Sequence, residues 1–445
     1  KGAPEVLLER ATTIRVGDET RPLGPEAHAA ATAAYAGFAE RGLRTLALAA
    51  RDAPEAAPLD ADVVERDLTL LGIVGIIDPP RAETPDAIAM ARAAGIRTIM
   101  ITGDAAPTAQ AVAREVGLDA DRVVRGPDLD EMDGAAVDAA LAEAAIFARV
   151  APEHKVRLVQ RLQASGRRVA MTGDGVNDAP ALAQADVGVA MGIRGTDVAR
   201  AAADVILTDD NFASIVAAVG EGRRQYANIR KFVCYLISSN TAEVIAICAA
   251  LLIGGPLLFL PVQILWMNLV TDGPTALALG LEPLERAAMS RRPRPRAEPI
   301  IDARRLTLIG AVAGYIAAAT LAVFFVCGAL DPAALAYAQT MAFTGMVLME
   351  KINVFNFRTL DDRGGPPRLG AHGNAWLLAA VVGSLSLHAL AVYAPPLQQA
   401  LGTVPLALSD WLALVAVGAP VVVVGVVAKR VARDGDSQVV ARSSV

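Results

Sequence analysis

The chain has 445 residues, of which 54% are hydrophobic, 20% are charged and only 4% are aromatic, and its formal net charge is −6. This length indicates more than one domain. We expect no nucleic acid among the partners of a chain with a net negative charge. All three cysteines lie in apolar runs, which argues against a disulfide-stabilised secreted domain. Charged residues are concentrated in the first half and long apolar runs in the second. We therefore predict a soluble half followed by a membrane half.

The first residues, to about Arg66, are alanine-rich and acidic and differ in composition from those that follow. We interpret them as the end of a separate domain. The chain starts at Lys1 without a methionine, and neither a basic leader nor the apolar core of a signal peptide follows. We therefore expect a truncated chain without a signal peptide.

Between about Leu70 and Leu207, short β-branched runs alternate with helical patterns such as Thr84–Ala94 and Glu153–Ala164. This alternation predicts a parallel sheet of βαβ units with ligands at the carboxyl ends of the strands. The expected strands are Leu70–Ile77, Ile96–Ile101, Ile146–Arg149, Arg168–Met171, Val187–Ala190 and Val205–Leu207.

Two of these strands end in groups that phosphoryl transfer requires. The strand at Ile96–Ile101 runs into Thr-Gly-Asp at Thr102, where a hydroxyl and a glycine turn are able to bind a phosphoryl oxygen. The strand at Arg168–Met171 runs into Thr-Gly-Asp-Gly-Val-Asn-Asp, whose carboxylates Asp174 and Asp178 suit Mg²⁺. Lys155 is placed to neutralise charge on the transferring group.

Each of these features also has a purely structural interpretation. A lone Thr-Gly-Asp is usually a turn or a helix cap, and a lone lysine is usually solvated. The eleven-residue run Thr172–Leu182, T-G-D-G-V-N-D-A-P-A-L, together with the other two features in order and near strand ends, favours a phosphoryl-transfer site.

The second half contains six apolar segments that pass the length of about 20 residues needed to cross a bilayer. The connections near Arg291–Arg296 and Arg358–Arg368 and the tail Lys429–Arg433 are rich in arginine, whereas the alternate connections have none. The positive-inside rule therefore places the soluble half in the cytoplasm. The expected spans are Phe232–Ile253, Leu257–Leu279, Leu306–Leu330, Leu335–Phe355, Ala375–Ala394 and Leu412–Ala428.

Three acidic residues, Glu243, Asp272 and Glu350, lie within these spans, where ionisable groups are costly and mark functional sites. Polar residues share their helix faces: Asn240 precedes Glu243 by three positions, and Asn268 and Thr271 precede Asp272. Such oxygens suit Ca²⁺ better than a soft metal. For Asn240 and Thr271 alone, hydrogen bonds between helices are the slightly better explanation, but they do not explain the three acids.

Two neighbours of the acids bear on this site. Gly273-Pro274 is expected to break the helix after Asp272 and free backbone carbonyls. Lys351 follows Glu350 and either neutralises it or extends toward the cytoplasmic end of its span.

Four motifs resemble the signatures of P-type ATPases: the run at Thr172, M-I-T-G-D at Met100, D-P-P-R at Asp78 and K-G-A-P-E at Lys1. The resemblance covers essentially the whole chain. It implies a haloacid-dehalogenase-like phosphorylation domain into which a nucleotide-binding domain is inserted.

Residue by residue, the resemblance implies three groups of site residues. Asp174 is implied as the Mg²⁺ ligand with Asn177 and Asp178 beside it, and the phosphoryl group is implied to lie among Thr102, Gly103 and Lys155. Contacts to ATP are implied for Lys1, Arg44, Asp104 and Arg149.

The central motif of that family is absent. The phosphorylated aspartate of P-type ATPases lies in Asp-Lys-Thr-Gly-Thr, and no such string occurs in the 445 residues. We therefore expect a C-terminal fragment whose partner is the missing N-terminal part of the pump, with the actuator domain and the first four membrane helices. Alone, it is expected to be inactive.

The membrane half resembles calcium-transporting P-type pumps at S-S-N-T-A-E (Ser238), N-L-V-T-D-G (Asn268) and M-E-K-I-N (Met349). The cation ligands that this resemblance implies are Asn240, Glu243, Asn268, Thr271, Asp272 and Glu350. A sodium–potassium pump would have an acid at Asn268, and a heavy-metal pump a Cys-Pro pair.

We therefore predict an α/β haloacid-dehalogenase-like domain with an all-α domain of six transmembrane helices, after a remnant of an α+β nucleotide-binding domain. The expected limits are 1–68 for the remnant, 69–222 for the phosphorylation domain, 223–430 for the membrane domain and 431–445 for a tail. The predicted function is ATP-driven Ca²⁺ transport with Mg²⁺, in an integral protein of a bacterial plasma membrane. The alternatives are a channel or carrier with a degenerate phosphatase-like domain, and a soluble phosphatase, which leaves the apolar segments unexplained.

Overall fold

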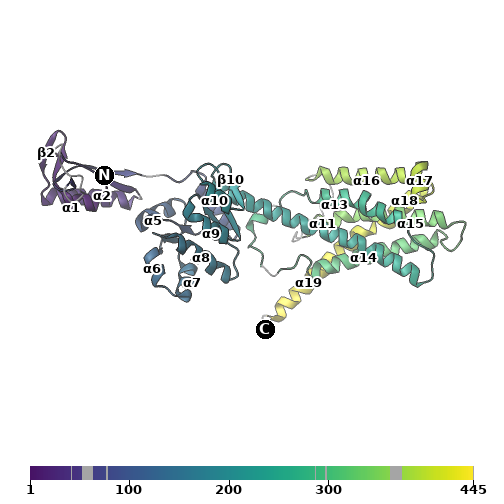
Figure 1. Ribbon diagram of the computed structural model, residues 1–445. Coiled ribbons are helices and arrows are strands. Elements are labelled where there is room, and N and C mark those ends of the chain that lie inside the picture. The colour runs from purple at the N-terminus through teal and green to yellow at the C-terminus, as the bar shows by residue number, and fades with distance from the viewer. Residues whose placement is uncertain are drawn as a thin grey trace. The chain divides into compact units, whose positions relative to one another are not determined.

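The computed structural model describes residues 1–41, 43–52, 64–76, 79–285, 287–295, 298–360 and 373–443, without the side chains of 39, 40, 44 and 433–443. The chain divides into two compact units (Figure 1). The first comprises Lys1–Val219 with Met289–Pro293, and the second Gly220–Ala288 with Arg294–Val445.

The first unit begins with a four-stranded sheet of order β2-β1-β4-β3, accompanied by helices α1 (Pro4–Arg10) and α2 (Pro25–Glu40). Its strands are β1 (Ala11–Val16), β2 (Glu19–Pro22), β3 (Arg44–Ala50) and β4 (Leu68–Ile76). The sequence predicted that a strand at Leu70–Ile77 belongs to the parallel sheet, and this prediction is wrong. That segment, β4, pairs in parallel with β1 and antiparallel with β3. An apolar run predicts a buried strand but does not identify its neighbours, which here lie earlier in the chain.

The rest of the first unit has the predicted alternation of parallel strands and helices. It contains two three-stranded parallel sheets, of order β5-β7-β6 and β10-β9-β8, where the sequence predicted one sheet. The sequence did not predict β6, whose three residues contain only two apolar positions, Val123 and Val124. The strands are β5 (Met100–Ile101), β6 (Val123–Arg125), β7 (Ile146–Ala148), β8 (Ala170–Gly173), β9 (Val187–Met191) and β10 (Val205–Leu207).

Helices cover these sheets and supply their cores. Leu158 of the amphipathic helix α8 is buried with Phe147 of β7, and its neighbour Val159 is buried with Met171 of β8. One helix thus contributes to both cores. The helices are α4 (Thr84–Ala93), α5 (Ala106–Glu115), α6 (Gly126–Glu131), α7 (Gly134–Glu143), α8 (Pro152–Ala164), the short 3₁₀ helix η1 (Val176–Asp178), α9 (Ala179–Gln184) and α10 (Asp197–Ala202).

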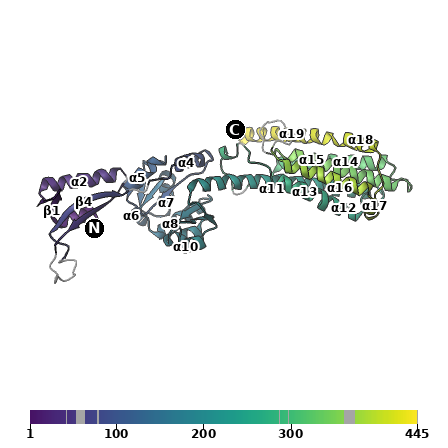
Figure 2. The same ribbon diagram turned by 90° about the horizontal axis from the view of Figure 1, so that it is seen from above.

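The second unit is a bundle of helices that run alongside one another in both views (Figures 1 and 2). Its longest helix, α11 (Phe212–Leu252), has 41 residues, and its first residues are counted with the first unit. The others are α12 (Pro261–Leu265), the π-helix η2 (Trp266–Asp272), α13 (Gly273–Leu279), α14 (Ala303–Val326), α15 (Leu335–Phe357), α16 (Ala375–Tyr393), α17 (Pro395–Leu401), α18 (Leu408–Gly418) and α19 (Pro420–Ser443). A short 3₁₀ helix, η3 (Ala288–Ser290), lies near the boundary between the units.

Four helical stretches in the described part of the chain are long and apolar enough to cross a membrane: Phe212–Leu252, Ala303–Val326, Ala375–Tyr393 and Leu408–Ala432. The sequence predicted six. Of the other two, Leu257–Leu279 is helical from Pro261 to Leu279, but its middle, Trp266–Asp272, is a π-helix, so it contains no long α-helix. The second, α15, is a continuous helix of 23 residues with buried polar side chains that include Glu350, Lys351 and Asn353.

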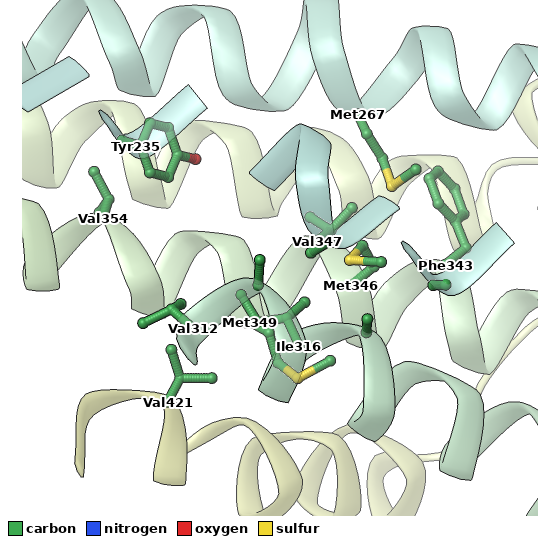
Figure 3. Packing of buried hydrophobic residues seen from close by; sticks show 14 of the residues in the cluster. Tyr235, Met267, Val312, Ile316, Phe343, Met346, Val347, Met349, Val354 and Val421 are labelled. Atoms are coloured by element: carbon green, nitrogen blue, oxygen red, sulfur yellow. The ribbon is translucent and has the colours of Figure 1, made fainter. Parts of the chain in front are cut away.

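The core of the bundle is built around α15, whose Phe343, Met346 and Val354 are fully buried. Figure 3 shows Val312 and Ile316 of α14 beside the side chains of α15. Large apolar side chains such as those of Leu252 and Val326, each 86% exposed, face outward. A bundle with exposed apolar residues outside and polar residues inside is the arrangement expected in lipid.

Candidate phosphoryl and cation sites

The Thr-Gly-Asp segment forms a tight turn at the carboxyl end of β5. The Thr102 hydroxyl donates a hydrogen bond to Asp104 Oδ2 (2.9 Å), and the Asp104 backbone N–H donates to Thr102 Oγ1 (3.1 Å). The Arg149 N–H donates to the Asp104 carbonyl (3.0 Å), and Arg149 has a left-handed backbone with φ 54°. The fold therefore brings together three predicted residues, Thr102, Asp104 and Arg149, that lie up to 47 positions apart.

A second cluster lies after β8 and is organised by Asp178. Lys155 of α8 donates to Asp178 Oδ1 (2.5 Å), while the backbone N–H groups of Asp174 and Gly175 donate to Oδ2 (3.2 and 3.1 Å). Asp178 is buried, with 7% of its surface exposed. Its carboxylate therefore holds the loop and the lysine in place.

Asp174 and Asn177 have the opposite character, because both side chains are exposed at the same loop. Mg²⁺ often takes only one or two carboxylates and completes its shell with phosphate oxygens and water. An exposed Asp174 beside a glycine-containing loop fits that requirement. Gly103, also predicted at the phosphoryl group, is exposed as well.

Two residues predicted to contact ATP lie in the first sheet. Lys1 is exposed and precedes Gly2, which pairs with Ala47 of β3. Arg44 begins β3, but its side chain lies outside the described residues, as does the whole of Asp78 from the D-P-P-R motif.

In the helical unit, Glu243 and Asn268 contact each other across α11 and η2. Asn268 Nδ2 lies 3.0 Å from Glu243 Oε2 and 3.4 Å from Oε1, and it also donates to the Ile264 carbonyl (3.0 Å). Glu243 is 4% exposed. The amide thus fixes a buried carboxylate, and the two predicted ligands are neighbours.

Asp272 is fully buried and receives hydrogen bonds on one of its oxygens. Tyr235 donates its hydroxyl to Oδ1 (2.9 Å), and the Lys351 ammonium forms an ion pair with the same atom. Lys351 is only 1% exposed, so the predicted extension of this side chain toward the cytoplasmic end is wrong. The lysine points inward because Asp272, Tyr235 and the Thr271 carbonyl offer it acceptors within the bundle.

Several buried carboxylate oxygens have no hydrogen-bond partner within the described part of the chain. They are Asp272 Oδ2 and both oxygens of Glu350. Glu350 interacts electrostatically with Asp272 and Glu243. Buried oxygens without donors are costly unless a ligand is bound to them.

The remaining predicted ligands differ in their surroundings. Thr271 is buried and donates its hydroxyl to the Met267 carbonyl (2.9 Å), while Asn240 lies on the exposed side of α11. Sequence reasoning missed Tyr235, although it precedes Glu243 by eight positions and so lies on a related helix face. It also missed Ser384 of α16, which donates to the Thr271 carbonyl (3.2 Å).

The helix around these ligands is not broken where the sequence suggested. Residues Trp266–Asp272 form a π-helix, and α13 starts regularly at Gly273 with Pro274 in its first turn. Proline is tolerated there because the first N–H groups of a helix have no intrahelical partner. The widened turn therefore lies before Gly273-Pro274 and includes Asn268, Thr271 and Asp272, a type of distortion that is frequent at functional sites.

Across the residues that the structure describes, no three His, Cys, Asp or Glu side chains converge closely enough to hold a metal ion. A cation site in this bundle therefore has to draw on amide, hydroxyl and carbonyl oxygens beside the carboxylates. These are ligand types that Ca²⁺ accepts.

Comparison with known proteins agrees with this division of the chain. A family model described as "Cation transporting ATPase, C-terminus" matches residues 256–431, and one for haloacid dehalogenase-like hydrolases matches residues 7–186. The chain is 42% identical over 94% of its length to the "Calcium-transporting ATPase" of Bacillus subtilis. The chain is therefore similar to cation-transporting ATPases over nearly its whole length.

Two further proteins that are similar to this chain bear similar names. It is 38% identical to the "Endoplasmic reticulum calcium ATPase srcA" of Aspergillus fumigatus over 95% of its length, and 39% identical to "Calcium-transporting ATPase 1" of Bacillus cereus over 92%. It covers 47% of the Bacillus subtilis protein and 48% of each of the other two, so it spans about half the length of these relatives.

These matches confirm the predicted fold class, a haloacid-dehalogenase-like domain with parallel sheets joined to a membrane domain of apolar helices. They also confirm the resemblance to P-type cation pumps and the assignment as an integral membrane protein. The channel or carrier with a degenerate phosphatase-like domain is not favoured.

Proposed function

We propose that this chain forms the phosphorylation and membrane parts of an ATP-driven pump that moves Ca²⁺ out of the cytosol through an aspartyl phosphate. The observation that carries the proposal is a pair of buried carboxylates, Glu243 of α11 and Asp272 of the π-helix η2, with the half-buried Asn268 of η2 in contact with Glu243. A divalent ion that leaves water needs fixed oxygens and nearby negative charge to offset its lost hydration. The buried carboxylates of Glu243 and Asp272 supply the negative charge, and the neighbouring amide, hydroxyl and carbonyl groups supply further oxygens.

In the first unit, the chain's own residues are suited to hold a phosphoryl group. Asp178 keeps the Lys155 ammonium in place, and the exposed Asp174 carboxylate is available for Mg²⁺. Bound there, Mg²⁺ neutralises charge on the phosphoryl oxygens. The Thr102 hydroxyl lies at the end of β5 and is able to turn from Asp104 to a phosphoryl oxygen.

The phosphorylated aspartate is proposed to come from a preceding segment of the pump. The reason is that Asp-Lys-Thr-Gly-Thr is absent from the sequence, while the chain covers about half of its relatives. Lys1, Arg44, Asp104 and Arg149 are proposed to contact ATP. The membrane is proposed to be a bacterial plasma membrane, with the first unit in the cytoplasm.

The test is Ca²⁺-dependent phosphorylation by ATP of the protein in which this chain is joined to its aspartate-bearing segment. Glu243→Gln and Asp272→Asn each keep the shape of the side chain and remove one charge. Each is expected to raise the half-saturating Ca²⁺ concentration more than about tenfold, which corresponds to about 1.4 kcal/mol.

Asp331→Asn is the matched control. Asp331 is an exposed acid in the same unit whose Oδ1 accepts from the Ala333 N–H, a bond that asparagine also accepts. Its half-saturation is expected to be unchanged. Unchanged half-saturation in both site variants, or activation by Na⁺ or Zn²⁺ in place of Ca²⁺, would refute the proposed substrate.

A further inference from the structure

Lys351 has the surroundings of a bound cation. Its side chain is 1% exposed and comes from the middle of the bundle on α15. The ammonium donates to the Thr271 carbonyl (2.9 Å) and to the Tyr235 hydroxyl (3.0 Å), and it pairs with Asp272 Oδ1. An ammonium group has three donors, and each of them is used on an oxygen.

These acceptors are the oxygen types that a hard metal ion uses: a carboxylate, a backbone carbonyl and a hydroxyl. They come from α11 and η2, the elements that also carry Glu243 and Asn268. On the other side of Asp272, the Oδ2 atom and the Glu350 carboxylate are buried without hydrogen-bond partners within the described residues. One group of oxygens thus surrounds an ammonium, and another is left for a further cation.

The charges of the cluster agree with this division. Glu243, Asp272 and Glu350 contribute three negative charges when ionised, and Lys351 contributes one positive charge. The remaining two negative charges are neutralised by a single Ca²⁺. Because an ammonium and a metal ion cannot occupy the same oxygens, the lysine excludes a second Ca²⁺ from this part of the cluster.

We infer that Lys351 is a built-in cation that fills one cation position of the transport site, so that the pump binds one Ca²⁺ fewer than its oxygens would otherwise hold. This inference rests on the proposed function. Lys351 is then a residue that determines the number of ions bound. If Lys351 only linked α15 to α11 and η2, its replacement would destabilise the bundle and would not increase the number of bound Ca²⁺ ions.

The test is equilibrium dialysis with ⁴⁵Ca²⁺ of the purified protein in detergent, in which this chain is joined to its preceding segment as in the phosphorylation assay. Lys351→Met keeps the length and apolar stem of the side chain and removes the charge. We expect this variant to bind one more Ca²⁺ per chain at saturation than the unmodified chain. Lys351→Gln, which keeps a polar group beside Asp272, is expected to show the same gain.

Lys231→Met is the matched control. Lys231 is also buried, at 2% exposure, and pairs with Glu285 at 3.1 Å, but it donates to none of the oxygens around Asp272 that the structure records. Its loss removes a buried ammonium without freeing those oxygens, so the number of bound ions is expected to stay the same. In the double variant Lys351→Met/Asp272→Asn, the shared carboxylate is lost and the additional ion is expected to disappear.

Helical circular dichroism shows whether each variant is folded. Folded Lys351 variants that bind the same number of ions as the unmodified chain, or fewer, overturn the inference. A gain of one bound Ca²⁺ in Lys231→Met also overturns the inference. If neither Lys351 variant folds, the inference is overturned as well, because the lysine then has a structural role. The phosphorylation assay with Glu243→Gln and Asp272→Asn tests the proposed function separately, because it does not depend on how many ions are bound.

Discussion

Replacing Gly173 by alanine is expected to disrupt the loop that Asp178 organises. A Cβ atom at Gly173 would lie 2.4 Å from Asp178 Cβ, 2.7 Å from its Cγ and 2.9 Å from its Oδ2. These separations are far below van der Waals contact, and Asp178 is held by Lys155 and by two backbone N–H groups, so it cannot move without losing hydrogen bonds. Overpacking of this kind costs about 1–3 kcal/mol.

Hydrogen exchange of the full chain, resolved to peptides within residues 170–191, measures this cost as local opening. A loss of about 1–3 kcal/mol makes these amides exchange about 5–150-fold faster. The amides of Asp174 and Gly175 report most directly, because they donate to Asp178. Gly37→Ala serves as the control, since no atom lies within 4 Å of a Cβ at this position in α2. Equal exchange in Gly173→Ala and the unmodified chain would refute the clash.

Two further variants test other parts of the chain. Arg358→Met leaves the buried Glu282 carboxylate without its Nε bond of 2.8 Å, so it is expected to destabilise the bundle by about 3–5 kcal/mol, and Glu282→Gln in the same chain to restore part of the loss in thermal unfolding. In the first unit, hydrogen bonds from the backbone N–H groups of Ile193 and Arg194 lower the pKa of Asp210 below its ordinary 3.8. The ionised form therefore stabilises the fold above about pH 4, and this contribution is lost as the pH falls through the lowered pKa. Asp210→Asn is expected to make thermal unfolding less sensitive to acid below about pH 4, and an unchanged acid dependence would contradict this assignment.

The strand ends of the first unit were predictable because their signals are local. A β-branched run followed by Thr-Gly-Asp indicates a strand and a turn, and β5 and β8 both end in this way. The pairing of β4 was not predictable, because its partners β1 and β3 are chosen by packing with residues such as Leu8 and Ala47. A short run of apolar residues contains no information on that choice.

The residue types of the polar cluster around Asp272 were predictable from the sequence, but their arrangement was not. Acids within apolar helices are visible in any sequence, and their helix faces follow from a period of about 3.6 residues. The direction of Lys351 depends on Tyr235, which lies 116 positions earlier, and on the position of η2. Ser384 of α16, which donates to the Thr271 carbonyl in the π-helix, likewise lies 113 positions from its partner.

The arrangement around Asp272 differs from the way most proteins treat buried charge. A buried ion pair gains little over apolar packing, because desolvation offsets the attraction between its members. Here the pair of Lys351 and Asp272 is accompanied by a Glu350 carboxylate without hydrogen-bond partners among the described residues, which increases the cost. Buried polar groups that lack hydrogen-bond partners are found mainly at functional sites. The excess of buried carboxylate over ammonium therefore supports the proposed cation site, and the place of Lys351 beside Asp272 supports the proposed limit on the number of bound ions.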